Sequence, residues 1–338
     1  MHPGLLPRLA VALLATSATA CMPGLFTPAT TLQTPRGTEK AILGEADEFP
    51  RFRLPDHGTK LAEVDADDLA DDTELVILDR DGDARALVLS EMSYHHVAEG
   101  TLGGRPIALA YCVVCDSAVA LTPVVDGRTL HVSAGGLSNG VVLLRDDETG
   151  SYWNIFTGEA LAGPLAGKTM ARFPVARMRA VEARAARPGL ELVRADTSLY
   201  GRMWIAGVEK LARRPAGYMP PWFRRTFGHP DERREELELG LGVVAGGCAR
   251  FYPASELAKR GGPFVDRVGR ADVRVDQDGR GLGRAQAVDA AAAPFAVWGR
   301  WYGFAASFPG CDVWSAAAPA ADPAPAALAG LRAPCSDR

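Results

Sequence analysis

Four side chains that bind soft metals lie close together in this chain. His95, His96, Cys112 and Cys115 all fall within SYHHVAEGTLGGRPIALAYCVVCDSAVAL, the stretch from Ser93 to Leu121. Thiolate and imidazole ligands suit zinc and copper, and a Cys-x-x-Cys pair places two sulfurs within reach of one ion. The spacing predicts a copper or zinc site formed by Cys112, Cys115 and His95, with His96 as the candidate fourth ligand. Such a site would serve a metal carrier or a redox centre.

Two other uses of the same cysteines stay open. Cys-x-x-Cys pairs also exchange disulfides, although the first cysteine then usually begins a helix, and here β-branched residues follow Cys112. The third interpretation is a non-enzymatic binding module of the cell envelope, in which the pair is a local structural disulfide beside two surface histidines. A c-type haem is excluded because Asp116 stands where the ligating histidine would follow. No nucleotide is expected, because the glycine-rich GRGLGR segment lacks the required spacing. Whether the protein is an enzyme is left open.

The N-terminus has the features of an export signal. Arg8 precedes a short apolar run that ends in Ala18-Thr19-Ala20-Cys21. The Ala-x-Ala ending fits ordinary signal peptidase, whereas a cysteine after small residues resembles a bacterial lipoprotein signal, although Ala18 stands where leucine is usual. We favour the second interpretation and expect a lipid on Cys21. Lipid chains at this position would hold the protein at a membrane surface. The predicted location is therefore the periplasm or cell envelope.

The charge balance argues against a nucleic-acid partner. The formal net charge is −4, whereas phosphate binding needs clustered cations on a basic domain.

Turn and periodicity signals predict an α+β fold dominated by antiparallel β-sheet. Asp-Gly dipeptides between apolar runs favour tight hairpins. Two such hairpins are expected in Glu74–Leu89 and Ala118–Ser133, turning at Asp81-Gly82 and Asp126-Gly127. The expected helices are Val175–Gly189 and Thr197–Arg214.

The chain also resembles itself at a shift of 165 residues. The residues that recur at this shift are Gly82, Ala84, Arg85, Ser90, Glu91, Gly104 and Arg105. The soft ligands do not recur: His95, His96, Cys112 and Cys115 fall on Arg260, Gly261, Gln277 and Arg280. A residue set that one copy lacks is less typical of scaffolding than of a site.

These observations predict two related repeats, the second of them degenerate and shorter. The expected organisation is a signal peptide over 1–20, a tether over 21–48, a first repeat with the His/Cys site over 49–212, a linker over 213–238, a degenerate second repeat over 239–314 and an Ala/Pro-rich disordered tail over 315–338.

Five motifs occur in an order that resembles a known family. They are YHH at 94–96, TLGGRP at 101–106, YCVVCDS at 111–117, ETGSYW at 148–153 and TGEALAGPLAGK at 157–168. This pattern is similar to that of the exported bacterial and archaeal family called domain of unknown function 3179, in which a tandem copy is common. The resemblance covers roughly 49–193 and implies a shared fold and site, but no activity.

The resemblance carries over some site residues more safely than others. His95 and Cys112 match the family pattern, whereas the second cysteine is threonine in some relatives, which weakens Cys115. His96 stands where glutamate is usual, and Asp116 replaces a glycine. The residues expected to line a pocket beside the cysteines are Tyr111, Ser117 and Trp153, although Trp153 could equally be a core residue.

Overall fold

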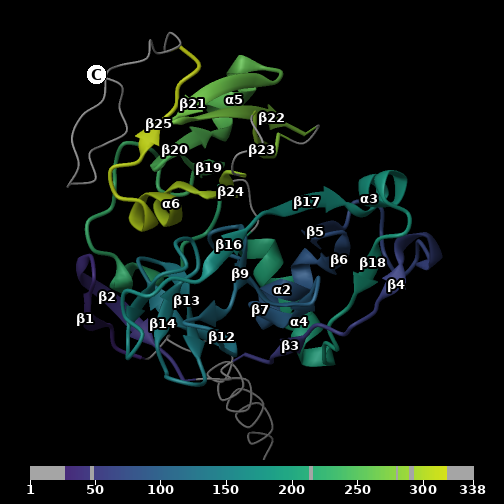
Figure 1. The fold of residues 1–338 in the computed structure, drawn as a ribbon, viewed down its shortest axis with the longest axis horizontal. Helices are drawn as coiled ribbons and strands as arrows, with labels where there is room; N and C mark the ends of the chain where they lie inside the picture. Colours follow the sequence, from purple (N-terminus) through teal and green to yellow (C-terminus); the bar gives the residue numbers. More distant parts are fainter. Residues whose placement is uncertain (1–26, 46–48, 213–215, 279–280, 289–292, 318–338) are drawn as a thin grey trace, which may run out of the picture.

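Antiparallel strands dominate the fold, which confirms the predicted α+β class (Figure 1). The computed structural model describes residues 27–45, 49–212, 216–278, 281–288 and 293–317. The helices are α2 (Leu89–His95), α3 (Ala180–Ala186), α4 (Leu199–Ala212), α5 (Ala254–Arg260) and α6 (Trp301–Ser307), with the 3-10 turns η1 (Leu61–Glu63) and η2 (Phe223–Thr226).

Three sheets form the larger part of the molecule. A six-stranded sheet has the order β1 (Thr30–Thr34), β2 (Gly37–Leu43), β12 (Val132–Ser138), β13 (Val141–Asp146), β14 (Tyr152–Asn154) and β15 (Ala160–Ala162). A five-stranded sheet has the order β16 (Ala171–Phe173), β9 (Ser117–Thr122), β8 (Arg105–Cys112), β7 (Val97–Leu102) and β3 (Phe52–Arg53). A second five-stranded sheet has the order β17 (Val175–Arg179), β5 (Glu74–Arg80), β6 (Asp83–Val88), β18 (Glu191–Val193) and β4 (Thr59–Lys60).

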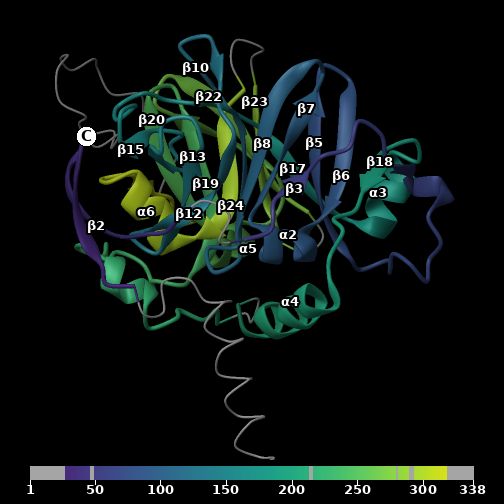
Figure 2. The same cartoon turned by 90° about the horizontal axis from the view of Figure 1, so that it is seen from below.

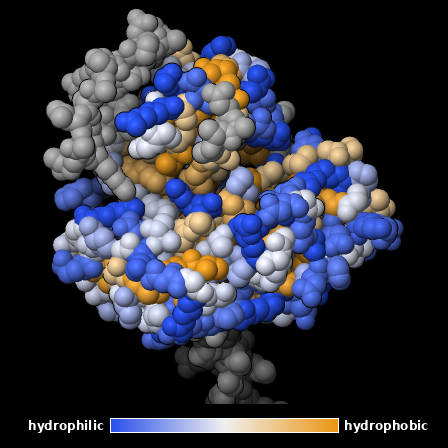
Figure 3. All heavy atoms as spheres, viewed as in Figure 1, coloured by the Kyte–Doolittle hydropathy of each residue, from blue (hydrophilic) through white to orange (hydrophobic). Residues whose placement is uncertain are grey.

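Two smaller sheets follow later in the chain. One has the order β24 (Phe295–Arg300), β19 (Leu239–Ala245), β20 (Cys248–Pro253) and β25 (Asp312–Val313). The other has the order β21 (Phe264–Val268), β22 (Ala271–Gln277) and β23 (Gly283–Ala287). A short ribbon pairs β10 (Val124–Val125) with β11 (Arg128–Thr129). Figure 3 shows apolar residues in the recess between the part that carries β19–β23 and the rest of the molecule.

Both predicted Asp-Gly turns are present. Asp81 and Gly82 join β5 to β6 with φ values of 55° and 87°, and Asp126 and Gly127 join β10 to β11 with φ values of 50° and 78°. Both central residues of each turn take positive φ, as the tight hairpin geometry requires. Glycine adopts this conformation without the steric cost that a side chain brings, and aspartate tolerates it better than most residues.

The order of elements in the second part of the chain matches that in the first. β5, β6, α2, β7 and β8 succeed one another as do β19, β20, α5, β21 and β22, and β5 begins at residue 74 while β19 begins at 239. The sheet orders β17-β5-β6-β18 and β24-β19-β20-β25 also agree. Residues 123–174 separate β9 from β17, whereas only residues 288–294 separate β23 from β24. A common origin of the two parts stays a prediction.

Residues that recur at the 165-residue shift occupy equivalent places in the two sheets. Arg85 on β6 forms an ion pair with Glu191 on the parallel strand β18, at 3.4 Å. Arg250 on β20 forms an ion pair with Asp312 on the parallel strand β25, at 3.2 Å. The recurring arginine therefore connects the same two strands in each part.

Three segments differ from what the sequence predicts. The expected tether contains β1 and β2, and β2 pairs with β12, so it covers a strand edge that would otherwise be open. The expected helix over 175–189 begins as strand β17, because pairing with β5 outweighs local helix propensity, and only α3 is helical. The expected linker contains η2, in which Phe223 and Thr226 are buried.

The hairpin of β8 and β9 lies inside the largest hydrophobic core. Ile107 to Cys112 on β8 and Ser117 to Leu121 on β9 are all buried. Such uninterrupted burial is typical of strands that are covered on both faces. Figure 2 shows this region enclosed by neighbouring strands, with α4 on the outside. Among the described helices, none combines the length and apolar character needed to cross a membrane.

Candidate functional site

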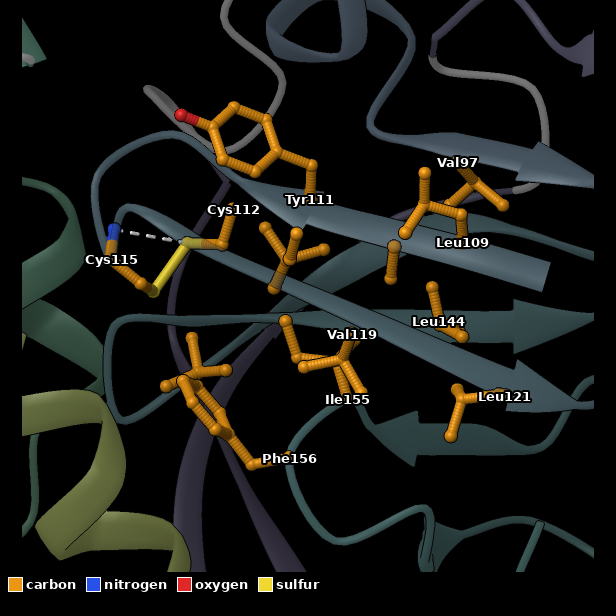
Figure 4. Packing of buried hydrophobic residues seen from close by; sticks show 14 of the residues in the cluster. Val97, Leu109, Tyr111, Cys112, Cys115, Val119, Leu121, Leu144, Ile155 and Phe156 are labelled. Carbon is orange, nitrogen blue, oxygen red and sulfur yellow. Dashed lines mark hydrogen bonds between the residues drawn. A yellow bond between two sulfur atoms is a disulfide. The ribbon is translucent and has the colours of Figure 1, made fainter. Parts of the chain in front are cut away.

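The β8–β9 hairpin brings Cys112 and Cys115 together. Cys112 is the last residue of β8 and pairs with Ser117 of β9, so the four residues between them form the turn. The two sulfurs are joined in a disulfide, with Cα atoms 5.3 Å apart and side chains only 1% and 0% exposed. Figure 4 shows the disulfide at the tip of the hairpin, with the Tyr111 ring pointing away from it. Alternation along a strand places neighbours 111 and 112 on opposite faces.

Each sulfur has a hydrogen-bond donor. The backbone N–H of Cys115 donates to Cys112 Sγ at 3.3 Å, and the Tyr302 hydroxyl lies 3.1 Å from Cys115 Sγ and 3.2 Å from the Gly140 carbonyl, so these two acceptors share its one hydrogen. Tyr302 lies on α6, and its ring stacks on Phe227 at a centroid separation of 5.7 Å. Burial raises the pKa of the Tyr302 phenol far above its ordinary value, so the hydroxyl keeps its proton. The site therefore includes a residue from the second part of the chain.

The turn is also held by its backbone. The Cys115 carbonyl accepts hydrogen bonds from the Ser117 hydroxyl at 3.1 Å and from the Arg300 N–H at 2.9 Å. A side chain at Gly299 would collide with the Ser117 hydroxyl. The expected pocket residue Ser117 is thus part of the contact between β9 and β24, where only glycine allows the close approach.

The two histidines bond to backbone carbonyls. His95 ends α2; its Nδ1 lies 2.8 Å from the Pro50 carbonyl and its Nε2 lies 3.4 Å from the Thr197 hydroxyl. His96 Nδ1 lies 3.2 Å from the Tyr111 carbonyl and therefore carries the hydrogen. Burial lowers the pKa of His96 to about 4, so the ring is neutral at neutral pH.

The predicted four-ligand set stays a prediction. The described residues contain no group of three or more His, Cys, Asp or Glu side chains arranged to hold a metal ion. The histidine rings contact Pro50, Thr197 and Tyr111, while the sulfurs contact each other and Tyr302.

A buried charge network lies beside the turn and was not predicted. Asp116, with a φ of 51°, accepts a hydrogen bond from the Tyr111 hydroxyl at 3.3 Å. Arg177 on β17 pairs with Asp116 at 3.0 Å and with Glu74 at 3.0 Å. The replacement of the family glycine by Asp116 was the only signal in the sequence. Arg177 gave none, because its segment was expected to be helical.

Glu209 on α4 makes stability depend on pH. Burial, reinforced by the charge of Asp116, raises the pKa of this carboxyl from 4.5 to about 7. Between these values the unfolded chain releases a proton that the folded protein keeps, so the folded state loses stability as the pH rises. We expect Glu209→Gln to raise the free energy of unfolding at pH 8 by about 1–3 kcal/mol, and to change nothing at pH 4. Urea unfolding at both pH values tests this, with the exposed Glu232→Gln as control; an equal gain at both would contradict it.

Two cavities flank the disulfide. An apolar cavity of about 150 Å³ is lined by the two valines of the turn, Val113 and Val114, together with His96 and Trp204 of α4. A larger, charged cleft of about 690 Å³ has Tyr302 in its wall. Residues that adjoin the disulfide, Val113, Val114 and Tyr302, therefore line these cavities, whereas neither cysteine lines either of them.

The expected pocket residue Trp153 belongs to the core. It is 0% exposed, and its indole N–H donates to Asp146 at 2.9 Å. Asp146 also accepts from the backbone N–H groups of Thr149 and Ser151, at 2.6 Å and 3.1 Å. The ETGSYW motif thus forms a turn around a buried carboxylate.

Comparison with known proteins gives a family without a known activity. No curated protein matches the chain, and no solved structure matches it. The family model described as a protein of unknown function, DUF3179, matches residues 46–300. Since this match covers most of the chain, the protein belongs to the DUF3179 family.

Proposed function

We propose that Cys112 and Cys115 form a thiol–disulfide redox centre. The observation that carries the proposal is the donor supplied to each sulfur: the Cys115 N–H to Cys112 and the Tyr302 hydroxyl to Cys115. Hydrogen bonds to a thiolate stabilise it, and thiolates are the reacting species in disulfide exchange. The two donors would therefore stabilise the thiolates of the reduced state, and they are in place in the oxidised state as well.

A purely structural role explains the pair less well. Closing a loop of four residues stabilises a protein by about 2 kcal/mol in the chain-entropy model. Cys112 and Ser117 are already paired in the β8–β9 ladder, so the hairpin is closed without the disulfide. Because the closed loop is so short, the disulfide also removes little entropy from the unfolded chain compared with one that closes a long loop.

The exchange would proceed through Cys112. A thiolate of a dithiol donor attacks Cys112 Sγ, the bond between the sulfurs breaks, and Cys115 leaves as a thiolate that accepts the Tyr302 hydrogen bond. The second donor thiol then attacks the mixed disulfide and releases Cys112. The donor ends as a disulfide, and the two released thiolates take protons from solvent. Because both sulfurs are buried, a side chain of the surrounding wall must move first.

Reduction under native conditions is the test. We expect dithiothreitol to make Cys112 and Cys115 reactive to iodoacetamide while the protein stays folded. Mass spectrometry should then find two fewer carbamidomethyl labels on the Cys112→Ser/Cys115→Ser variant. Cys311 is a buried free thiol whose pKa burial raises to about 12, so Cys311→Ser should leave the labelling unchanged. A pair that is reduced only in denaturant would show that the disulfide is a staple.

Tyr302→Phe separates a role in the chemistry from a role in packing. Without the hydroxyl, Cys115 becomes a poorer leaving group, and we expect the reduction rate to fall by about tenfold, the equivalent of a hydrogen bond worth 1.4 kcal/mol. Tyr252→Phe is the matched control, because this buried tyrosine donates instead to Asp266, at 2.7 Å. Equal rates in the two variants would contradict the assigned role of Tyr302.

The same samples address the metal prediction. Elemental analysis of the reduced protein, made without a histidine tag, measures copper and zinc. One ion per chain that is lost in Cys112→Ser would replace the redox proposal by a metal centre.

The location proposed for this centre is the cell envelope. The apolar run before Ala18-Thr19-Ala20-Cys21 supports export with a lipid on Cys21. Both lie outside the described residues.

A further inference from the structure

An apolar surface lies on the outer side of α4. Leu199 is 74% exposed and Met203 is 68% exposed, and they lie one turn apart on the same side of the helix. Tyr200 and Leu211 are each 41% exposed and lie at the edge of this face, where Tyr200 contacts Tyr94 and Leu211 lines an apolar cavity with Trp204. Large apolar side chains that gather on one exposed helix face mark an interaction surface rather than ordinary scatter.

The inner side of α4 packs against α2 and against the apolar cavity. Gly201 faces Tyr94 of α2 so closely that a Cβ atom would meet the Tyr94 ring at 2.7 Å. Trp204 and Val208 line the apolar cavity above the Val113–Val114 turn. The helix is thus fixed by its inner face, whereas Leu199 and Met203 point to the opposite side and stay largely exposed.

The N-terminal segment reaches the described part of the chain at this helix. Thr27, the first described residue, lines the same cavity as Trp204 and Leu211. Thr27 comes six positions after Cys21, and a chain of that length spans at most about 20 Å. A lipid on Cys21 would therefore hold the bilayer within about 20 Å of Thr27, beside α4.

We propose that the outer face of α4 docks on a lipid bilayer. The expected closeness of the bilayer to α4 rests on the lipid proposed above for Cys21. The exposed apolar residues support the proposal independently of that lipid. Arg202 and Lys210 on the helix are exposed, and Arg213-Arg214 follow it in the sequence. Apolar residues flanked by cations are typical of helices that lie in the interface of anionic membranes. Docking in this way would place the apolar cavity and the disulfide turn near the membrane surface.

Vesicle flotation tests the surface without the lipid. The full chain carrying Cys21→Ser is mixed with phosphatidylglycerol and phosphatidylethanolamine vesicles, and its partition coefficient is compared with that of the same chain carrying Leu199→Ser/Met203→Ser. We expect the double substitution to lower partitioning at least tenfold. Val265→Ser/Val288→Ser is the matched control, because these valines are 58% and 50% exposed on the second part of the chain. Circular dichroism verifies that both variants are folded.

Three results would overturn the proposal. The first is equal partitioning of the α4 variant and its parent, and the second is an equal loss in the valine control. The third is a concentration-dependent dimer that Leu199→Ser/Met203→Ser abolishes, since the face would then bind a second copy of the chain. Mass spectrometry of the protein extracted from membranes tests the lipid on Cys21 separately, so a missing lipid and a failed α4 surface are distinguishable.

Discussion

Asp146→Ala is expected to lower the free energy of unfolding by about 3–5 kcal/mol. Asp146 is 0% exposed and accepts hydrogen bonds from Thr149, from the Ser151 N–H and from the Trp153 indole. Removal of the carboxylate leaves these donors buried without an acceptor, at a cost of about 1–3 kcal/mol for each unsatisfied group. Urea denaturation followed by tryptophan fluorescence measures the loss, and the emission of Trp153 is expected to change with it.

The adjacent residue supplies the control for this substitution. Asp147 forms an ion pair with Arg51 at 2.7 Å, but its side chain is 35% exposed. Ion pairs at the surface contribute about 0–1 kcal/mol, so Asp147→Ala should have a small effect. If Asp146→Ala lowered the free energy of unfolding by less than about 1 kcal/mol, the role given to Asp146 would be contradicted. Removal of a buried acceptor that serves several donors should have a larger effect.

This result bears on how the family motifs are interpreted. In ETGSYW, Thr149, Ser151 and Trp153 donate hydrogen bonds to Asp146, so these residues serve the turn around that carboxylate. The turn positions strands β13 and β14, and Figure 4 shows Leu144 of β13 and Ile155, which follows β14, packed in the same core as the disulfide hairpin. A motif can therefore be specific to a family and still be structural.

Local signals in the sequence predicted local structure well. The Asp-Gly turns, the helix that became α4 and the β-rich class all depend on residues that are neighbours in the chain. The strand β17 could not be predicted in this way, because its conformation is decided by pairing with β5 about a hundred residues earlier. The same reason explains why local signals do not predict β1 and β2, since β2 pairs with the distant strand β12.

The sequence predicted the cysteines of the candidate site but not the residues that contact them. The Cys-x-x-Cys pair pointed to Cys112 and Cys115, but spacing alone does not distinguish a disulfide from a metal site. Tyr302 gave no signal, because it reaches Cys115 from α6, 187 residues further along the chain. The residue type alone made His95 and His96 candidate ligands. Their hydrogen bonds to the Pro50 and Tyr111 carbonyls depend on tertiary packing, which the sequence does not show.

Arg177→Met is expected to lower the free energy of unfolding by about 3–5 kcal/mol. The Arg177 side chain is 7% exposed, and it pairs with Asp116 and Glu74 at 3.0 Å each. Loss of one member of a buried ion pair leaves the other charge without compensation, which costs more than the pair itself contributes. Arg187→Met is the surface control, because the Arg187 side chain is 38% exposed in its pair with Asp79.

A second substitution identifies which interaction accounts for the lower free energy of unfolding expected for Arg177→Met. Asp116→Gly restores the residue usual in the family pattern, removes the orphaned carboxylate and suits a φ of 51°, which glycine adopts readily. We therefore expect Asp116→Gly/Arg177→Met to be more stable than Arg177→Met alone, with a coupling energy of about 1–3 kcal/mol. Simple additivity would mean that Arg177 acts through packing or through Glu74. Coupling would mean that the buried Arg177 cation compensates the Asp116 carboxylate beside the disulfide.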